Sequence, residues 1–411
     1  MEEKLYLLQR HLPELLELDA LIRHGERHLR VTTVHQVPMG QISLPIHVIE
    51  LGSQSPNAPV IGFFGGVHGV ERIGSQVLMS WLHSLIHRLQ WDDQLHRRLE
   101  KVRLVFMPMI NPGGIWRRTR SNPNGVDLMR NAPIDAMGKA PFLVGGHRIS
   151  RHLPWYRGKR GEPMEPEAQA VIRTVREKLF SSPFSMSLDC HSGFGRRDRV
   201  WCCYARSHRP IPHIAEVYRL KQVFEQTYPN HHPYLIEPQS INYTTHGDLW
   251  DYLYDDAQEQ QPDHTFLPFT LEMGSWLWVR KNPRQMLDFF GYFNPMISHR
   301  HHRVLRQHLP FFEFLGLGVQ DPEEELCIGV PALSPCAYVG DTYLRVDRRT
   351  EQRKAENDHG DDELACVAPD HKSPPKTTTM RVWTPVLPLA GKGCNALAPA
   401  LTQLFVALTP Q

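Results

Sequence analysis

The sequence predicts an α/β protein in which a mixed central β-sheet is flanked by helices on both faces. Two observations support this fold class. Apolar runs of strand length end in glycine-containing loops, and segments with helical periodicity lie between these runs. In sheets of this kind, ligands bind outside the carboxyl ends of the strands. Residues that follow predicted strands are therefore the first candidates for a functional site.

The individual elements are predicted from local patterns. Residues 3–20 carry leucines at helical spacing and predict one amphipathic helix, and residues 29–52 hold two β-rich runs around "PMGQ" and predict a hairpin. Buried strands are predicted at "APVIGFFGG", "VRLVFM", "FSMSLDC" and "FLPFTLEM". Helices are predicted at "GSQVLMSWLHSLIHRL" and over residues 165–180, and "NPGG" predicts a turn.

The chain of 411 residues divides into three predicted parts. A helical lead-in covers residues 1–30, and the main domain covers residues 31–318. Residues 319–411 are polar or of mixed charge with little periodicity, as in "DRRTEQRKAENDHGDDE", and predict a linker and an extension of unknown role.

Composition narrows the function classes. A formal charge of +2, from 46 basic and 44 acidic residues, gives no bulk attraction for nucleic acid. No stretch approaches the ~18 consecutive apolar residues of a membrane span, and the opening segment lacks the features of a signal peptide. Seven scattered cysteines without a CxxC motif predict reduced thiols. We therefore expect a cytoplasmic protein without a nucleic-acid or membrane partner, and the sequence leaves its oligomeric state open.

A metal site is predicted around "GGVHGVE". The His-x-x-Glu spacing occurs three times, and the pairs that begin at His11 and His213 lack any further metal-like context. His68 and Glu71 instead follow a predicted strand, and one helical turn would bring both side chains to the same side. His191 follows another predicted strand, and Glu272 stands at the end of a third. Two imidazoles and one carboxylate form a suitable ligand set for a catalytic zinc ion.

Six motifs occur in one order: "HGVE", "NPGG" with "RRTRSNPNGVDLMRN", "GEPMEPEAQAV", "DCHSGFG", "INYTTHGDLWDY" and "FTLEMGS". With these motifs, residues 40–290 resemble the zinc metallocarboxypeptidases of the carboxypeptidase A-like family, and the chain resembles a cytoplasmic bacterial-type member. The resemblance implies one Zn²⁺ per chain, a carboxypeptidase A-like fold for the main domain, and a peptide or peptide-like amide substrate with a free carboxylate.

The resemblance also implies roles for individual residues. It implies that His68, Glu71 and His191 are the zinc ligands, with Asp127 behind the first histidine. Glu272 matches the glutamate that acts as general base and acid. The remaining matches are Arg117 for polarising the scissile carbonyl, with Arg120 as second choice, Arg130 for binding the terminal carboxylate, and Tyr243 for closing over the substrate.

The sequence does not decide which of two residues lines the pocket for the terminal side chain of the substrate. Asp248 and Leu249 both lie where the family lines this pocket, and an acid would favour lysine or arginine whereas a leucine would favour apolar residues. The family usually has asparagine before the carboxylate-binding arginine, and Met129 stands there in this chain.

Two other functions compete with a carboxypeptidase. The same zinc ligands would serve an amidohydrolase or deacylase of the aspartoacylase or succinylglutamate desuccinylase type, or an amidase of cell-wall peptides. A non-catalytic zinc-binding module is the third alternative, and loss of Glu272 would leave such a module unaffected.

Overall fold

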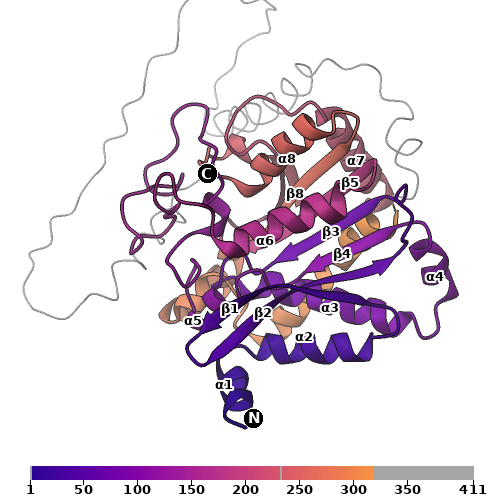
Figure 1. Ribbon diagram of the computed structural model, residues 1–411, viewed down its shortest axis with the longest axis horizontal. Helices are drawn as coiled ribbons and strands as arrows, with labels where there is room; N and C mark the ends of the chain where they lie inside the picture. Colours follow the sequence, from indigo (N-terminus) through magenta and orange to yellow (C-terminus); the bar gives the residue numbers. More distant parts are fainter. Residues whose placement is uncertain (1, 232–233, 319–411) are drawn as a thin grey trace, which may run out of the picture. The chain divides into compact units, whose positions relative to one another are not determined.

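The computed structural model describes residues 2–231 and 234–318, and these residues build one eight-stranded sheet with helices on both faces (Figure 1). The strand order is β1-β2-β4-β3-β5-β8-β6-β7. The strands are β1 (Arg30–Met39), β2 (Ile42–Gly52), β3 (Val60–Gly65), β4 (Arg103–Met107), β5 (Phe184–Ser192), β6 (Asp198–Cys202), β7 (Tyr234–Pro238) and β8 (Thr265–Met273). The predicted fold class is confirmed.

The sheet is mixed, and its centre is parallel. Strands β4, β3, β5 and β8 run parallel to one another, whereas β2 joins β4 and β6 joins β8 in antiparallel pairs. The predicted hairpin is confirmed, because β1 and β2 pair antiparallel from Arg30 opposite Glu50 to Met39 opposite Ile42. Every residue of β3, β4 and β5 is buried, which explains why these strands are almost continuously apolar.

The helices follow the strands along the chain. The α-helices are α1 (Glu2–His11), α2 (Pro13–His24), α3 (Arg72–Arg88), α4 (Asp93–Leu99), α5 (Pro112–Arg117), α6 (Pro166–Thr174), α7 (Ile214–Thr227), α8 (Leu249–Gln260), α9 (Trp276–Lys281), α10 (Ser298–Gln307) and α11 (Leu309–Glu313). Helix α6 continues into a π-helical stretch, η2 (Val175–Leu179), so the predicted helix over residues 165–180 is confirmed.

Alternate residues of β3 show which helices cover each face of the sheet. The Phe63 ring packs 4.5 Å from the ring of Trp81 on α3 and 5.9 Å from that of Phe312 on α11, measured between centroids. The Phe64 ring points the other way and lies 4.9 Å from the ring of Trp250 on α8. Side chains alternate between the two faces of a strand, so α3 and α11 cover one face and α8 covers the other.

Two local predictions are corrected. The helix predicted over residues 3–20 is two helices, because the chain breaks at Leu12 and α2 starts at Pro13, which has no N–H to donate within α1. The "NPGG" segment is the start of α5 rather than a simple turn, because the Asn111 side chain accepts a hydrogen bond from Gly114 N at 2.8 Å and caps this helix.

The described residues include only part of the predicted division of the chain into three. Helix α2 contacts α3, while the boundary at residue 30 stays a prediction. The predicted linker and extension over residues 319–411 lie outside the described residues. Within the described part of the chain, no helix combines the length and the apolar character that crossing a membrane requires.

Candidate active site

The carboxyl ends of three neighbouring parallel strands carry the candidate site. Strand β3 leads into the loop that holds His68, and Glu71 stands directly before α3. His191 lies near the end of β5, opposite Glu272 in the register of β5 with β8. Gly65, the last residue of β3, pairs with Cys190 of β5. This register alone brings residues that are far apart in sequence to one edge of the sheet.

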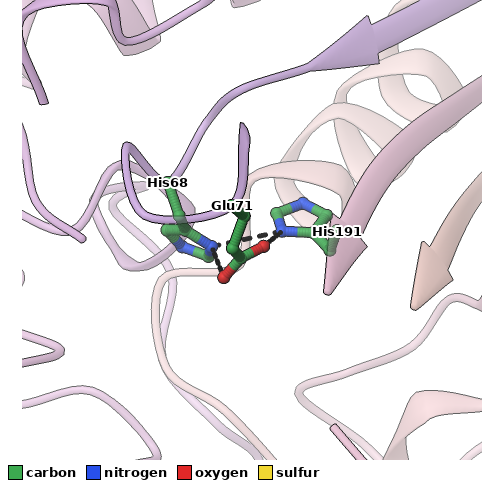
Figure 2. Close-up of side chains that lie close together, drawn as sticks. All are labelled: His68, Glu71 and His191. Carbon is green, nitrogen blue, oxygen red and sulfur yellow. Dashed lines mark hydrogen bonds and ion pairs between the residues drawn. The ribbon is translucent and has the colours of Figure 1, made fainter. Parts of the chain in front are cut away.

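Three of these side chains converge on one point. The Nδ1 atoms of His68 and His191 lie 2.9 and 3.1 Å from the two carboxylate oxygens of Glu71, and 3.2 Å from each other. Figure 2 shows the two rings approaching the Glu71 carboxylate from either side. All three residues are buried, and theirs is the one group of metal-binding side chains found among residues 2–231 and 234–318.

The outer nitrogens of both histidines face carboxylates. His68 Nε2 lies 3.1 Å from Asp127 Oδ1, and His191 Nε2 lies 2.8 Å from Asp189 Oδ2. Because a carboxylate only accepts hydrogen bonds, each neutral ring carries its hydrogen on Nε2 and presents a lone pair at Nδ1. Two lone pairs and a carboxylate then face one another, and they repel unless a cation lies between them. The residues present therefore fit a divalent metal ion such as zinc.

Nearby charges shift the pKa values of His191 and Asp127 in opposite directions. Burial lowers the pKa of His191, but Asp189 and Glu71 outweigh burial and hold that pKa well above its usual value. Burial raises the pKa of Asp127, but Arg120 and His68 outweigh burial and hold that pKa well below its usual value. The Asp127 carboxylate thus stays ionised behind His68, which favours binding of a cation by this histidine.

The structure distinguishes between the two candidate arginines. Arg120 donates from Nε to Asp127 Oδ2 at 2.8 Å and from Nη1 to Glu71 Oε1 at 3.2 Å. Arg117 is exposed and donates instead to the backbone oxygen of Pro123 at 2.7 Å. Arg120, the second choice from the sequence, therefore reaches the metal-binding group, and Arg117 lies outside it.

Glu272 lies beside the group in a buried position. Its Oε1 accepts a hydrogen bond from Phe194 N at 2.9 Å. Burial, together with the nearby charge of Glu71, raises the pKa of Glu272 to about 8. The Tyr243 hydroxyl is close enough to Arg130 and Glu272 for both charges to affect its pKa, which burial raises.

One candidate substrate-binding residue, Asp248, lines a small cavity. Arg130 is buried, its Nη1 lies 3.9 Å from Asp248 Oδ2, and its Nε has no hydrogen-bond partner. Asp248 lines the cavity together with Trp201, Gln239, Asp251 and Thr270, among others. Leu249 is buried and is not among the residues that line this cavity.

Comparisons with known proteins agree with this geometry. A family model described as zinc carboxypeptidase matches residues 19–276. The chain belongs to the zinc carboxypeptidase family. Carboxypeptidase E of Caenorhabditis elegans is 25% identical over 187 residues, which cover 41% of this chain and 38% of that protein. The carboxypeptidase N catalytic chain of Rattus norvegicus is 28% identical over 156 residues, covering 34% of this chain and 33% of that protein. The matches thus span less than half the length of these relatives.

A solved structure shows the shared fold. The crystal structure of thrombin activatable fibrinolysis inhibitor superposes with a TM-score of 0.52 at 17% identity, covering 73% of this chain and 72% of that chain. Membership of a zinc family and the donor set of His68, Glu71 and His191 together identify zinc as the cofactor.

Sequence reasoning missed one carboxylate of the site. Asp189 is fully buried, and its Oδ2 contacts both His191 Nε2 and the indole Nε1 of Trp250, the latter at 2.9 Å. The signal was available, because residues two apart in a strand point to the same face. The contact of Trp250 had no such signal, because α8 is distant in sequence and is brought to β5 only by the fold.

Proposed function

We propose that this chain is a zinc carboxypeptidase that hydrolyses the C-terminal amide bond of a peptide. One observation carries the proposal: the convergence of His68, Glu71 and His191 at a strand edge where Glu272 lies opposite His191. A catalytic base beside a metal-binding group is the arrangement that hydrolysis of an amide by water requires.

Each side chain has a proposed task. Zinc, when bound by the two histidines and Glu71, would supply a Lewis acid that polarises the scissile carbonyl and makes water more acidic. Glu272 takes a proton from the attacking water and passes it to the leaving amine. Arg120 stabilises the negative charge that develops on the carbonyl oxygen.

Substrate binding is proposed for a second group of residues. Arg130 binds the terminal carboxylate of the peptide, since its Nε is buried without a partner and a guanidinium can donate two parallel hydrogen bonds. Tyr243 covers the bound substrate. Asp127 holds the Nε2 hydrogen of His68, and Arg117 is left without a part in the reaction.

The cavity that Asp248 lines supports a preference for lysine or arginine at the C-terminus. Asp248 Oδ2 is buried without a hydrogen bond, and Asp251 lines the same cavity. A cationic side chain would donate the hydrogen bond that Asp248 Oδ2 lacks, because Arg130 Nη1 at 3.9 Å is too far away to form one. We therefore favour Asp248 over Leu249 as the residue that selects the terminal side chain, and Asp248→Asn should weaken the preference for basic residues.

The proposal is tested with matched peptides and the zinc-loaded protein. Three versions of one peptide end in lysine, in leucine or in a lysine amide, and Glu272→Gln protein is the control. Release of the terminal residue from the lysine peptide, absent with the amide and with the variant, would support the proposal. Cleavage of N-acyl amino acids without trimming of any peptide would refute it and favour a deacylase.

A cytoplasmic location is a separate proposal. It is supported by Cys190, Cys202 and Cys203, which are free and buried in the structure. Fractionation of the native host cells would test the proposal, and recovery of the protein in the secreted fraction would refute it.

A further inference from the structure

A segment beyond the family match contacts the loop that carries two of the metal ligands. Asn294 is buried, with 8% of its surface exposed. Its side-chain oxygen accepts a hydrogen bond from Ile73 N at 3.0 Å, and its side-chain nitrogen donates to Val70 O at 2.8 Å. Val70 and Ile73 stand on either side of Glu71, so one side chain holds the backbone around this ligand from both directions.

The same segment is tied to the strand that carries the third ligand. The backbone oxygen of Phe293 accepts a hydrogen bond from Ser192 Oγ at 2.7 Å. Ser192 follows His191 directly, and its backbone N–H donates to Glu71 Oε2 at 3.0 Å. Two consecutive residues, Phe293 and Asn294, therefore contact both elements that hold the metal-binding group.

The segment of residues 290–294 is itself fixed in place. Gln285 donates from Nε2 to Gly291 O at 2.5 Å, and the Asn294 side chain donates to Phe290 O at 3.0 Å. A Cβ atom at Gly291 would lie 1.9 Å from Gln285 O, so only glycine fits at this close approach. The guanidinium of Arg118 lies 4.1 Å from the centroid of the Phe290 ring and packs on it from outside.

We propose that Asn294 is a positioning residue for the metal site, and that the segment of residues 290–294 sets the spacing between Glu71 and His191. Ile73 N belongs to the first turn of α3, where backbone N–H groups have no partner within the helix. Asn294 supplies that partner and so fixes the start of the helix relative to β5. A metal site binds more tightly when its ligands are held in place before the ion arrives. The proposal concerns metal binding and does not depend on which bond the protein cleaves.

The test measures zinc affinity directly, by competition with a chromogenic chelator. Asn294→Leu keeps the approximate size of the side chain and removes both hydrogen bonds around Glu71. Its zinc Kd should rise by roughly 10- to 100-fold, the range typical of residues that support metal ligands. Ser192→Ala removes only the hydroxyl that contacts Phe293 and keeps the backbone N–H on Glu71, so we expect a smaller rise in Kd.

A matched control separates positioning from general stability. Ser182 lies just before β5, at its opposite end, where its buried hydroxyl contacts Ala58 O at 2.8 Å. Ser182→Ala should lower the Tm of the metal-free protein without changing the zinc Kd. The visible spectrum of bound Co²⁺ should change in Asn294→Leu and stay unchanged in Ser182→Ala.

The outcomes decide the proposal in either direction. A raised zinc Kd in Asn294→Leu and Ser192→Ala, with the control unchanged, supports it. A lowered Tm in these variants with a zinc Kd within twofold of the wild type overturns it, because both residues would then be merely structural. If Asn294→Leu does not fold, the zinc Kd of Ser192→Ala alone decides. Wild-type peptide cleavage is a separate measurement, so failure of this proposal is distinguishable from failure of the proposed function.

Discussion

Replacing Asp189 by asparagine tests the role of the carboxylate behind His191. Asp189 is fully buried, and its Oδ2 contacts His191 Nε2 at 2.8 Å and Trp250 Nε1 at 2.9 Å. Its Oδ1 has no hydrogen-bond partner. An asparagine can therefore place its oxygen at the Oδ2 position and its nitrogen at the Oδ1 position with little change in shape. The substitution removes the negative charge that makes His191 a stronger ligand and adds a buried amide N–H without a partner.

The expected change is a loss of zinc affinity. Loss of such a carboxylate typically raises the metal Kd by roughly 10- to 100-fold, which corresponds to about 1.4–2.7 kcal/mol. The assay is chelator competition at pH 7 with wild-type and Asp189→Asn protein. Trp250→Phe is the control, because it removes one donor to Asp189 but leaves the contact with His191, and it should change the Kd less.

One result would refute the reasoning. If Asp189→Asn folds and its zinc Kd stays within twofold of the wild-type value, the charge of Asp189 does not act through His191. An equal loss in Trp250→Phe would also contradict the argument, because it would show that packing around α8 matters more than the carboxylate.

Three further predictions concern the base and two buried titratable groups. Glu272→Gln should lower kcat by at least ~100-fold while the zinc Kd stays within about threefold, as chelator competition would show. Burial, with His231, lowers the pKa of His308 to about 3, so its contribution to stability is complete above pH ~6.5 and is lost as the pH falls toward 3. Between pH 7 and pH 5, the free energy of unfolding measured with urea should fall by about 2 kcal/mol less in His308→Gln than in the wild type. Burial raises the pKa of Asp198 to about 6, so its charged form costs stability above that pH. Asp198→Asn should gain about 1 kcal/mol at pH 7.5, since the residue is only partly shielded from water, and should gain nothing at pH 4. A gain in the free energy of unfolding of Asp198→Asn that does not vary with pH would contradict burial of the charge as the cause.

The local hydrophobic pattern was sufficient to predict the central strands of the fold. The strands β3, β4, β5 and β8 are buried on both faces, so each is an apolar run that is visible in the sequence. The hairpin of β1 and β2 was visible for a similar local reason. The strands β6 and β7 at one edge of the sheet were missed, because two of the five residues of β6 and all five of β7 are only partly buried and their pattern is weak.

The metal ligands could be predicted because strand ends mark the edge of a parallel sheet, and His68, Glu71 and His191 all follow or end a predicted strand. Their functional roles, by contrast, came from the resemblance to a family.

Other features depend on contacts that no local pattern contains. The sequence offered Arg117 and Arg120 as alternatives, and only the fold shows that Arg120 reaches Glu71 and Asp127. Only the fold shows that Asp248 lines the cavity and that Leu249 is not among its lining residues. Asn294 acts on a loop more than 220 residues away in sequence. The sequence by itself determined the fold class, which follows from periodicity, and it placed the candidate metal ligands next to strand ends, while the resemblance supplied their roles. Only the tertiary structure decided which side chains support these ligands, because hydrogen bonds between distant segments form only after the sheet and its helices have packed.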